Sequence, residues 1–298
     1  MKVIRQISEL REYSIKQRSE GKTVGLVPTM GFLHAGHASL IELAKDNCDK
    51  VITTLFVNPT QFAPHEDYDS YPRDFEHDYN IAKKAGSDIL FAPSREEMYD
   101  DFHTTTVTVG ELASIFEGKP RPHFFDGVAT VVAKLFNASI PTHAFFGQKD
   151  YQQSLVVKRL ESNMRYGIEI VVAPIVREEN GLAMSSRNKY LTEEQKVDAG
   201  ILHKSLLATK KFIESGEKNR KLINAFLLEK LRKLDTLKVD YAVSANGDDF
   251  SEPTVFEEGE KIVLLIGAIL GKTRLIDNMV VKSPTTKYNE DTRFVEGL

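Results

Sequence analysis

TVGLVPTMGFLHAGH, residues 23–37, is the stretch that decides the fold of this chain. Residues 23–27 form an apolar run typical of a buried strand, and the apolar spacing of residues 39–44 is typical of the start of a helix. His34 and His37 therefore lie where a strand passes into a helix. Backbone N–H groups at a helix start attract anions, and side chains three residues apart face the same way, so this turn suits phosphate groups. Alternatively, these two polar residues only cap the helix. The turn alone does not decide between phosphate binding and capping.

Strand-like and helix-like segments alternate on both sides of this turn. Strands are expected at residues 51–57, 88–91, 143–146 and 168–173, and helices at residues 75–85, 127–137 and 151–164. The alternation predicts an α/β, Rossmann-like fold, in which a mainly parallel sheet carries helices on both faces. Ligands of such sheets bind outside the carboxyl ends of the strands.

The pattern changes after about residue 176. A capping box of Thr192 and Gln195 predicts a long helix that continues to Ile213. A second helix is expected at residues 219–234, followed by three short strands near Val239, Ile262 and Arg274. Helices followed by strands are typical of a smaller α+β domain.

These patterns divide the chain into three parts. We expect a Rossmann-like domain at residues 1–176, a smaller α+β lid domain at residues 177–282 and a polar tail at residues 283–298. The first of these carries most of the candidate binding residues.

Composition excludes several classes of protein. The chain has 298 residues, 41% of them hydrophobic, and a formal net charge of -4, which is typical of a folded globular protein. A broad nucleic-acid surface needs many Lys and Arg, so we expect no nucleic-acid partner. The start lacks the apolar stretch of a signal peptide, and residues 262–270, the longest apolar run, are too short to span a bilayer. We therefore expect a cytoplasmic protein without a membrane partner. The single cysteine, Cys48, excludes an internal disulfide.

Polar residues follow the strand expected at residues 51–57. Asn58 and Gln61 lie beside a proline turn, where they can either hydrogen-bond a small polar substrate or simply cap the turn. Asp78 follows an acidic loop, and such carboxylates with water could hold Mg²⁺, although acidic loops are usually just solvated. Further on, Arg121 could reach a carboxylate or a phosphate.

A second strand-to-helix turn follows residue 146. Gly147 gives room, Lys149 supplies a compact positive charge for phosphates, and Gln153 lies one helical turn beyond it on the same side. An exposed lysine is the alternative, but the segment occupies the same kind of position as the turn with the two histidines.

The segment at residues 176–188 is the expected junction of the two domains. Its two serines and Arg187, in a loop that contains glycine, suit a mobile clamp over a polyphosphate. A plain linker would be equally rich in Ser, Asn and Gly, so this loop alone decides nothing.

Several motifs come in the order and at the spacings of one known family: PTMGFLHAGH, FVNPTQF, EDYDSYPRD, FFGQKDYQQ and GLAMSSRN. Over about residues 23–278 the chain resembles the pantothenate synthetases, the pantoate:β-alanine ligases. That family belongs to the nucleotidyltransferases with HxGH and KMSKS-type signatures, of which HAGH and MSSRN look like the local versions. The resemblance implies that ATP, with Mg²⁺, converts pantoate to pantoyl adenylate, from which β-alanine displaces AMP. It also implies a homodimer.

The resemblance also implies roles for individual residues. The ATP site would comprise Met30, Gly31, Phe32, Leu33, His34, Ala35, Gly36, His37, Gly147, Gln148, Lys149, Asp150, Val176, Met184, Ser185, Ser186 and Arg187. The catalytic donors among them would be His34, His37, Lys149 and Arg187. Pantoate would be held by Gln61 and Gln153, with Asn58 and Arg121 lining the pocket.

One motif departs from the family pattern. Where the family reads Arg-Pro-Gly-His-Phe, this chain has His123 in place of the glycine and Phe124 in place of the histidine. The sequence leaves open whether His123 substitutes for the missing imidazole.

Other functions compete with ligation. A different nucleotidyltransferase of the same superfamily would need extra cations for a phosphorylated partner, whereas the expected pocket offers the amides of Gln61 and Gln153. An aminoacyl-tRNA synthetase is disfavoured by the acidic balance and the short second domain. A non-catalytic nucleotide-binding protein could keep the ATP motifs, but the presence of Lys149 and both histidines speaks against it.

Overall fold

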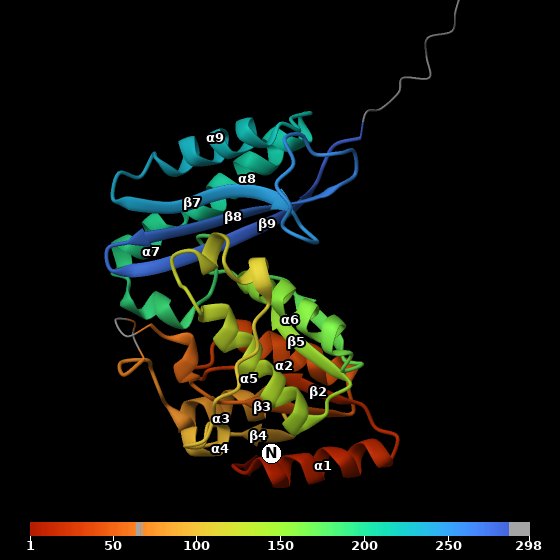
Figure 1. Cartoon of the computed structure of the whole chain (residues 1–298). Helices are drawn as coiled ribbons and strands as arrows, with labels where there is room; N and C mark the ends of the chain where they lie inside the picture. Colours follow the sequence, from red (N-terminus) through yellow and green to blue (C-terminus); the bar gives the residue numbers. More distant parts are fainter. Residues whose placement is uncertain (64–65, 67, 286–298) are drawn as a thin grey trace, which may run out of the picture.

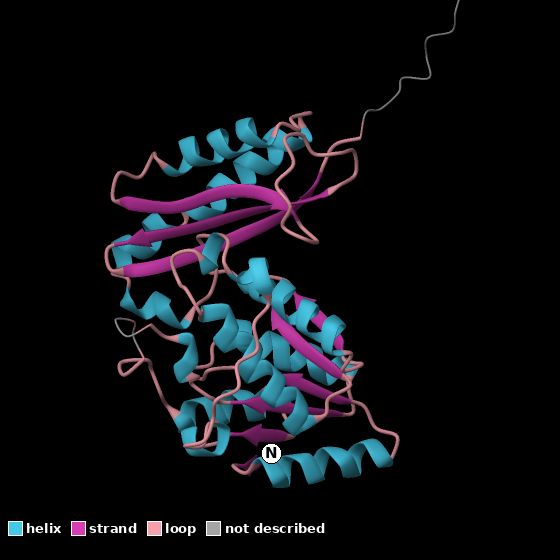
Figure 2. Ribbon diagram, in the orientation of Figure 1, coloured by secondary structure: helices cyan, strands magenta, loops and turns pink. Residues whose placement is uncertain are grey.

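The computed structural model describes residues 1–63, 66 and 68–285, which form two sheets with their own helices (Figure 1). In Figure 2 the sheet that contains the N-terminal strands lies below, and the three-stranded sheet of the C-terminal part lies above it. From residue 286 onward, the expected polar tail lies outside the described residues. Within the described part, no helix is both long and apolar enough to cross a membrane.

The larger sheet is entirely parallel and has the strand order β1-β4-β3-β2-β5-β6. Its strands are β1 (Lys2–Ile4), β2 (Val24–Val27), β3 (Lys50–Thr54), β4 (Ile89–Phe91), β5 (His143–Gly147) and β6 (Glu169–Ala173). Strand order reverses between β2 and β5, which is where open parallel sheets bind their ligands. The two expected phosphate-binding turns follow these two strands.

Helices cover both faces of this sheet, which confirms the predicted α/β class. The helices are α1 (Ile7–Ser19), α2 (Ala35–Asn47), α3 (Phe75–Lys84), α4 (Arg95–Met98), α5 (Phe124–Ser139) and α6 (Tyr151–Met164). One core joins α1, α5 and α6 to the sheet, and a second core joins α2 and α3 to its opposite face. Because both faces are covered, every residue of β2 is buried, and the strand reads as a continuous apolar run.

The parallel sheet and its helices, from β1 to β6, form the larger unit of the structure. The elements from α7 to β9 form the smaller unit, which has an antiparallel sheet of order β7-β8-β9. Its elements are α7 (Glu193–Ala199), α8 (Ile201–Glu214), α9 (Arg220–Leu231), β7 (Leu237–Asn246), β8 (Lys261–Leu270) and β9 (Thr273–Lys282). One face of the sheet packs on these helices. The other face packs on Tyr151 and Leu155 of α6, so the smaller unit rests directly on the larger one (Figure 1).

Two details of the smaller unit differ from expectation. The single helix predicted through Ile213 is broken at Gly200, because the Asn180 amide donates to the Lys196 carbonyl at 2.6 Å. The Gly200 N–H then bonds to the Val197 carbonyl at 3.2 Å, one residue short of the α-helical partner. The capping box of Thr192 and Gln195 is present. The three strands are also long, with 10 residues each, rather than short. The domain boundary at residue 176 stays a prediction.

Candidate active site

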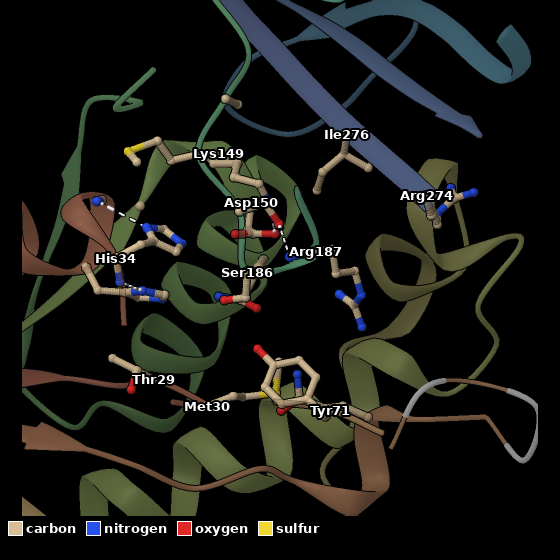
Figure 3. A pocket seen from close by; sticks show the side chains of 18 of the residues that line it. Thr29, Met30, His34, Tyr71, Lys149, Asp150, Ser186, Arg187, Arg274 and Ile276 are labelled. Atoms are coloured by element: carbon tan, nitrogen blue, oxygen red, sulfur yellow. Dashed lines mark hydrogen bonds and ion pairs between the residues drawn. The ribbon is translucent and has the colours of Figure 1, made fainter. Parts of the chain in front are cut away.

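A cavity of about 850 Å³ lies beside the ends of β2 and β5 and reaches β9 of the smaller sheet (Figure 3). The expected site residues that line it are Met30, His34, Gly36, His37, Gln61, Arg121, Gly147, Lys149, Asp150, Gln153, Val176, Met184, Ser185, Ser186 and Arg187. All four expected catalytic donors are therefore brought to one cavity. The expected residues that do not line it are Gly31, Phe32, Leu33, Ala35, Gln148, Asn58 and Asp78.

The histidine turn combines helix capping with exposed donor groups. Helix α2 begins at Ala35, earlier than the apolar spacing indicated, and His34 is its N-cap. The Gly36 N–H donates to Nδ1 of His34 at 3.1 Å, and the His34 N–H donates to Nδ1 of His37 at 3.3 Å. Since each Nδ1 accepts a hydrogen bond, each neutral ring carries its proton on Nε2. The sequence left open whether the histidines cap the helix or bind phosphates. The structure allows both roles, because a ring that caps through Nδ1 keeps its Nε2–H for a ligand.

Both imidazoles are neutral at pH 7. Burial, with a further contribution from the nearby Lys149 charge, lowers the pKa of His34 from 6.5 to about 4. Burial also holds the pKa of His37 well below its usual value, with His34 and Lys149 adding to the effect. The ring centroids lie 4.1 Å apart, so two charged rings would repel each other. The pair therefore offers neutral N–H donors and not cations.

The second turn is held by the smaller sheet. Asn278 of β9 donates its amide to the Gln148 carbonyl at 2.9 Å and to the Lys149 carbonyl at 3.0 Å. The Gln148 amide donates back to the Asn278 oxygen at 3.2 Å, which explains why this side chain does not line the cavity. The Lys149 ammonium lies 3.6 Å from Asp150, at the cavity wall (Figure 3).

The loop expected to act as a clamp touches both units. Ser186 donates its hydroxyl to the Phe32 carbonyl at 3.3 Å, and the Arg187 guanidinium lies 5.9 Å from the Tyr71 ring centroid. At the other end of the loop, Arg177 makes two hydrogen bonds to Asp277 of β9, at 2.7 and 2.9 Å. Serine and arginine side chains of this loop thus close the cavity opposite His34 (Figure 3).

The two amides expected near pantoate have different positions. Gln61 lines the cavity, whereas Asn58 is only 1% exposed and lies behind it. The Asn58 amide donates to the Gln61 side chain at 2.9 Å and to the Gly127 carbonyl at 3.0 Å, while its oxygen accepts from Tyr99 at 2.8 Å. The expectation that Asn58 lines the pocket is therefore wrong, because all its polar atoms are engaged in the protein.

Arg121 lines the cavity, but carboxylates already engage its guanidinium. It donates to both oxygens of Glu66, at 2.7 and 2.9 Å, and lies 3.8 Å from Glu117. Burial alone would raise the pKa of Glu66, but hydrogen bonds from Arg121 and its charge lower it overall. The guanidinium also lies over the Phe124 ring, 3.7 Å from its centroid.

The departure from the family motif also becomes clear in the structure. His123 is 88% exposed and does not line the cavity, whereas Phe124 does. The backbone φ at His123 is 68°, in the left-handed region that favours the glycine of the family pattern. His123 therefore does not substitute for the missing imidazole.

Asp78 contacts the protein backbone instead of the cavity. It is 3% exposed, and its two oxygens accept the N–H groups of Phe32 and Leu33. Burial raises its pKa, while these two hydrogen bonds act in the opposite direction. Among the described residues, no group of three or more His, Cys, Asp or Glu side chains could hold a metal ion. These contacts do not support the predicted role of Asp78 as a magnesium ligand.

Several cavity residues were missed from the sequence. Tyr71 lies within the EDYDSYPRD motif but received no role, and Arg274 comes from a strand recognised only approximately. Arg274 donates to Glu117 at 3.0 and 2.7 Å, which joins β9 to the larger unit across the cavity wall. The position of Arg274 depends on how the two units pack, so no local sequence signal could have found it.

Comparison with known proteins agrees with this geometry. The sequence model of the family described as pantoate-beta-alanine ligase matches residues 2–280. A pantothenate synthetase from Caldicellulosiruptor bescii is 47% identical, over 95% of this chain and 100% of its own. One from Aquifex aeolicus is 44% identical, over 94% of this chain and 99% of its own.

Solved structures agree as well. A pantothenate synthetase from Thermus thermophilus superposes with a TM-score of 0.87 and 40% identity, covering 94% of this chain and 99% of that one. A pantoate-beta-alanine ligase from Francisella tularensis, in complex with β-γ ATP and β-alanine, gives a TM-score of 0.74 and 32% identity, covering 94% of this chain and 97% of that one. The chain therefore belongs to the pantoate-beta-alanine ligase family.

Proposed function

We propose that this chain joins pantoate to β-alanine at the expense of ATP, releasing AMP and pyrophosphate. The observation that carries the proposal is the gathering of His34, His37, Lys149 and Arg187 around one cavity that also contains two neutral amides. In the first step, a pantoate carboxylate oxygen attacks the α-phosphorus and pyrophosphate leaves. In the second, the β-alanine amine attacks the acyl carbon, the amine loses a proton, and AMP leaves.

The first step concentrates negative charge on the phosphoryl oxygens and the leaving pyrophosphate. Fixed donors that point to this charge lower the barrier, because they do not need to reorganise during the reaction. The neutral Nε2–H groups of His34 and His37 can donate to phosphate oxygens, while Lys149 and Arg187 supply positive charge. Keeping the histidines neutral also avoids four adjacent cations in the free enzyme.

Neutral amides favour an acyl substrate over a phosphorylated one. Gln61 and Gln153 line the cavity and can hydrogen-bond the hydroxyl groups and carboxylate of pantoate. A second phosphate would require additional cations, but Glu66 and Glu117 already engage Arg121 and Arg274. This arrangement supports ligation over nucleotide transfer to a phosphorylated partner.

Other expected properties remain part of the proposal. The described residues do not fit a resident magnesium site, so we propose that Mg²⁺ enters on the phosphates of ATP and derive no step through it. The homodimer, the cytoplasmic location and the lid role of residues 177–282 stay predictions.

The decisive experiment is an assay of AMP release with ATP, pantoate and β-alanine together and with each omitted. Release that needs both acids supports ligation and separates it from the rival transferases. Release without β-alanine, or none in folded protein, would count against the proposal.

Gln153→Ala tests the substrate amides. We expect the KM for pantoate to rise about tenfold or more with a smaller change for ATP, because a buried polar substrate group loses its partner. Gln152→Ala is not a suitable control, since Gln152 bonds the backbone of Leu112 and Ile115. Lys158→Ala, on the exposed side of α6, is the matched control. Unchanged pantoate kinetics would remove Gln153 from the substrate site.

A further inference from the structure

The turn between β2 and α2 contains an anion-binding concavity of its own. Gly31 and Phe32 have φ angles of 91° and 50°, so two successive residues are left-handed. Successive N–H groups beside a turn of this kind can converge on one anion. Asp78 is that anion, because its two oxygens accept from Phe32 N–H at 2.9 Å and from Leu33 N–H at 2.6 Å. The protein thus fills this concavity with its own carboxylate, and ATP phosphates must bind elsewhere in the cavity.

Helix α3 holds the turn through two consecutive side chains. While Asp78 binds the N–H groups, the ring Nε2 of His77 lies 2.9 Å from the Leu33 carbonyl oxygen. A β-carbon on Gly31 would lie 3.0 Å from the Asp78 carboxylate, so the contact also favours glycine there. Phe32 is non-glycine in a left-handed conformation, which is unfavourable unless neighbouring groups stabilise it. The two side chains of α3 supply that stabilisation.

The turn determines where two cavity residues lie. Met30 comes immediately before it and His34 immediately after it, and both line the cavity, whereas Gly31, Phe32 and Leu33 do not. The turn therefore acts as a spacer between the two. It also provides the Phe32 carbonyl that accepts from Ser186 of the clamp loop. If the turn relaxed, the position of His34 and the contact between Phe32 and Ser186 would both change.

The Asp78 carboxylate has no comparable role in its own helix. Helix α3 is capped by Asp74, whose side chain accepts from the His77 N–H at 3.0 Å. Asp78 lies beyond this cap, and its oxygens accept from the two N–H groups of the turn instead. Asp74 therefore provides a control on the same helix, since removing it weakens α3 and leaves the Asp78 contacts in place.

We propose that Asp78 is a positioning residue for adenylate formation, which it supports by fixing the turn at residues 31–33 so that His34 meets the phosphates. This inference rests on the proposed ligase function. Because the turn belongs to the nucleotide side of the cavity, the first step depends on Asp78 much more than the attack of β-alanine on preformed pantoyl adenylate does.

The test compares Asp78→Ala and Asp78→Asn with Asp74→Ala. Single-turnover formation of pantoyl adenylate and the reaction of added pantoyl adenylate with β-alanine are measured separately, together with the melting temperature. A small misplacement of a reacting group can cost about 100-fold in rate, so we expect a loss of about that size in the first step for Asp78→Ala. Asp78→Asn keeps one acceptor and should lose about tenfold. The second step should stay within about threefold of the wild type in both.

Asp74→Ala should lower the melting temperature and leave both rates within about threefold, because it removes only a helix cap. The proposal is overturned if folded Asp78→Ala forms adenylate at the wild-type rate, or if both steps fall equally. If Asp78→Ala does not fold, the isosteric variant Asp78→Asn is used instead, and the ratio of its rates in the two steps decides whether the proposal holds. Wild-type protein that makes no adenylate would overturn the ligase function itself, whereas wild-type activity with unaffected Asp78 variants would overturn only this inference.

Discussion

The turns after β2 and β5 both present cavity side chains, but the protein holds them in opposite ways. The first is held by Asp78 from α3 of the same unit, through a carboxylate that binds backbone N–H groups. The second is held by Asn278 from β9 of the smaller unit, through an amide that binds backbone carbonyls. The histidine side of the site is therefore complete within the larger unit, whereas the position of Lys149 depends on the packing of the smaller one.

Among the tests of this comparison, Lys149→Ala should have the largest effect on the rate of the first step. We expect pantoyl adenylate formation to fall by about 100-fold or more, because one fixed donor to the developing charge is lost. Lys149 is partly exposed and forms an ion pair with its chain neighbour Asp150, so the melting temperature should change little. Single-turnover kinetics and thermal unfolding measure both, with Lys158→Ala as control. A near wild-type rate would mean that the second turn contributes no catalytic charge.

Asn278→Ala tests whether the smaller unit holds the second turn. Asn278 is 2% exposed, and its loss leaves the carbonyls of Gln148 and Lys149 without this donor. An unsatisfied buried polar group costs about 1–3 kcal/mol, so we expect lower stability and about a tenfold slower first step. Asn246→Ala, which loses a bond to Glu260 within the smaller unit, is the control for stability alone. If both variants slow the reaction equally, the link from Asn278 to Lys149 is not specific.

A pH titration of stability tests the first turn, and we expect it to show the smallest effect of the three experiments. The folded pKa of His34 is about 4 against 6.5 for the ordinary side chain, so the unfolded chain binds more protons between these values. Stability is therefore full above about pH 6.5 and falls as the pH decreases toward 4. We expect a loss of roughly 1–2 kcal/mol at pH 5 relative to pH 7 from this group. In His34→Asn, which keeps a helix cap without titrating, denaturant unfolding should show a smaller difference. An equal difference in both proteins would assign the pH dependence to other groups.

The comparison also explains how far the sequence could predict the structure. Both turns could be recognised because strand, glycine and helix start lie within a few residues of one another, and His34 through His37 cap their own helix. The parallel sheet followed from the same local alternation. Strand β1 was missed because its three residues, which begin with Lys2, form no apolar run like the three of β4, and because its pairing of Lys2 with Ile89 spans much of the larger unit.

The errors share a physical cause, since each depends on contacts between distant residues. The helix break at Gly200 requires the Asn180 side chain, which comes from a loop outside the helix. Asn58 follows a strand end as expected, yet Tyr99 and the Gly127 carbonyl draw it away from the cavity. The residues of a turn can thus be recognised from the local sequence, whereas the direction of a buried amide depends on the residues that pack around it.

The place of β9 in the chain affects how the enzyme is made. Residues Arg274 and Asn278 belong to the strand that ends at Lys282, so they leave the ribosome after nearly all other parts of the site. N-terminal parts of a nascent chain generally fold first, and the parallel sheet with its histidines can form while synthesis continues. Lys149 gains its support only once β9 has emerged. We therefore expect chains that end before β9 to form adenylate more slowly than the complete chain, because Lys149 lacks this support.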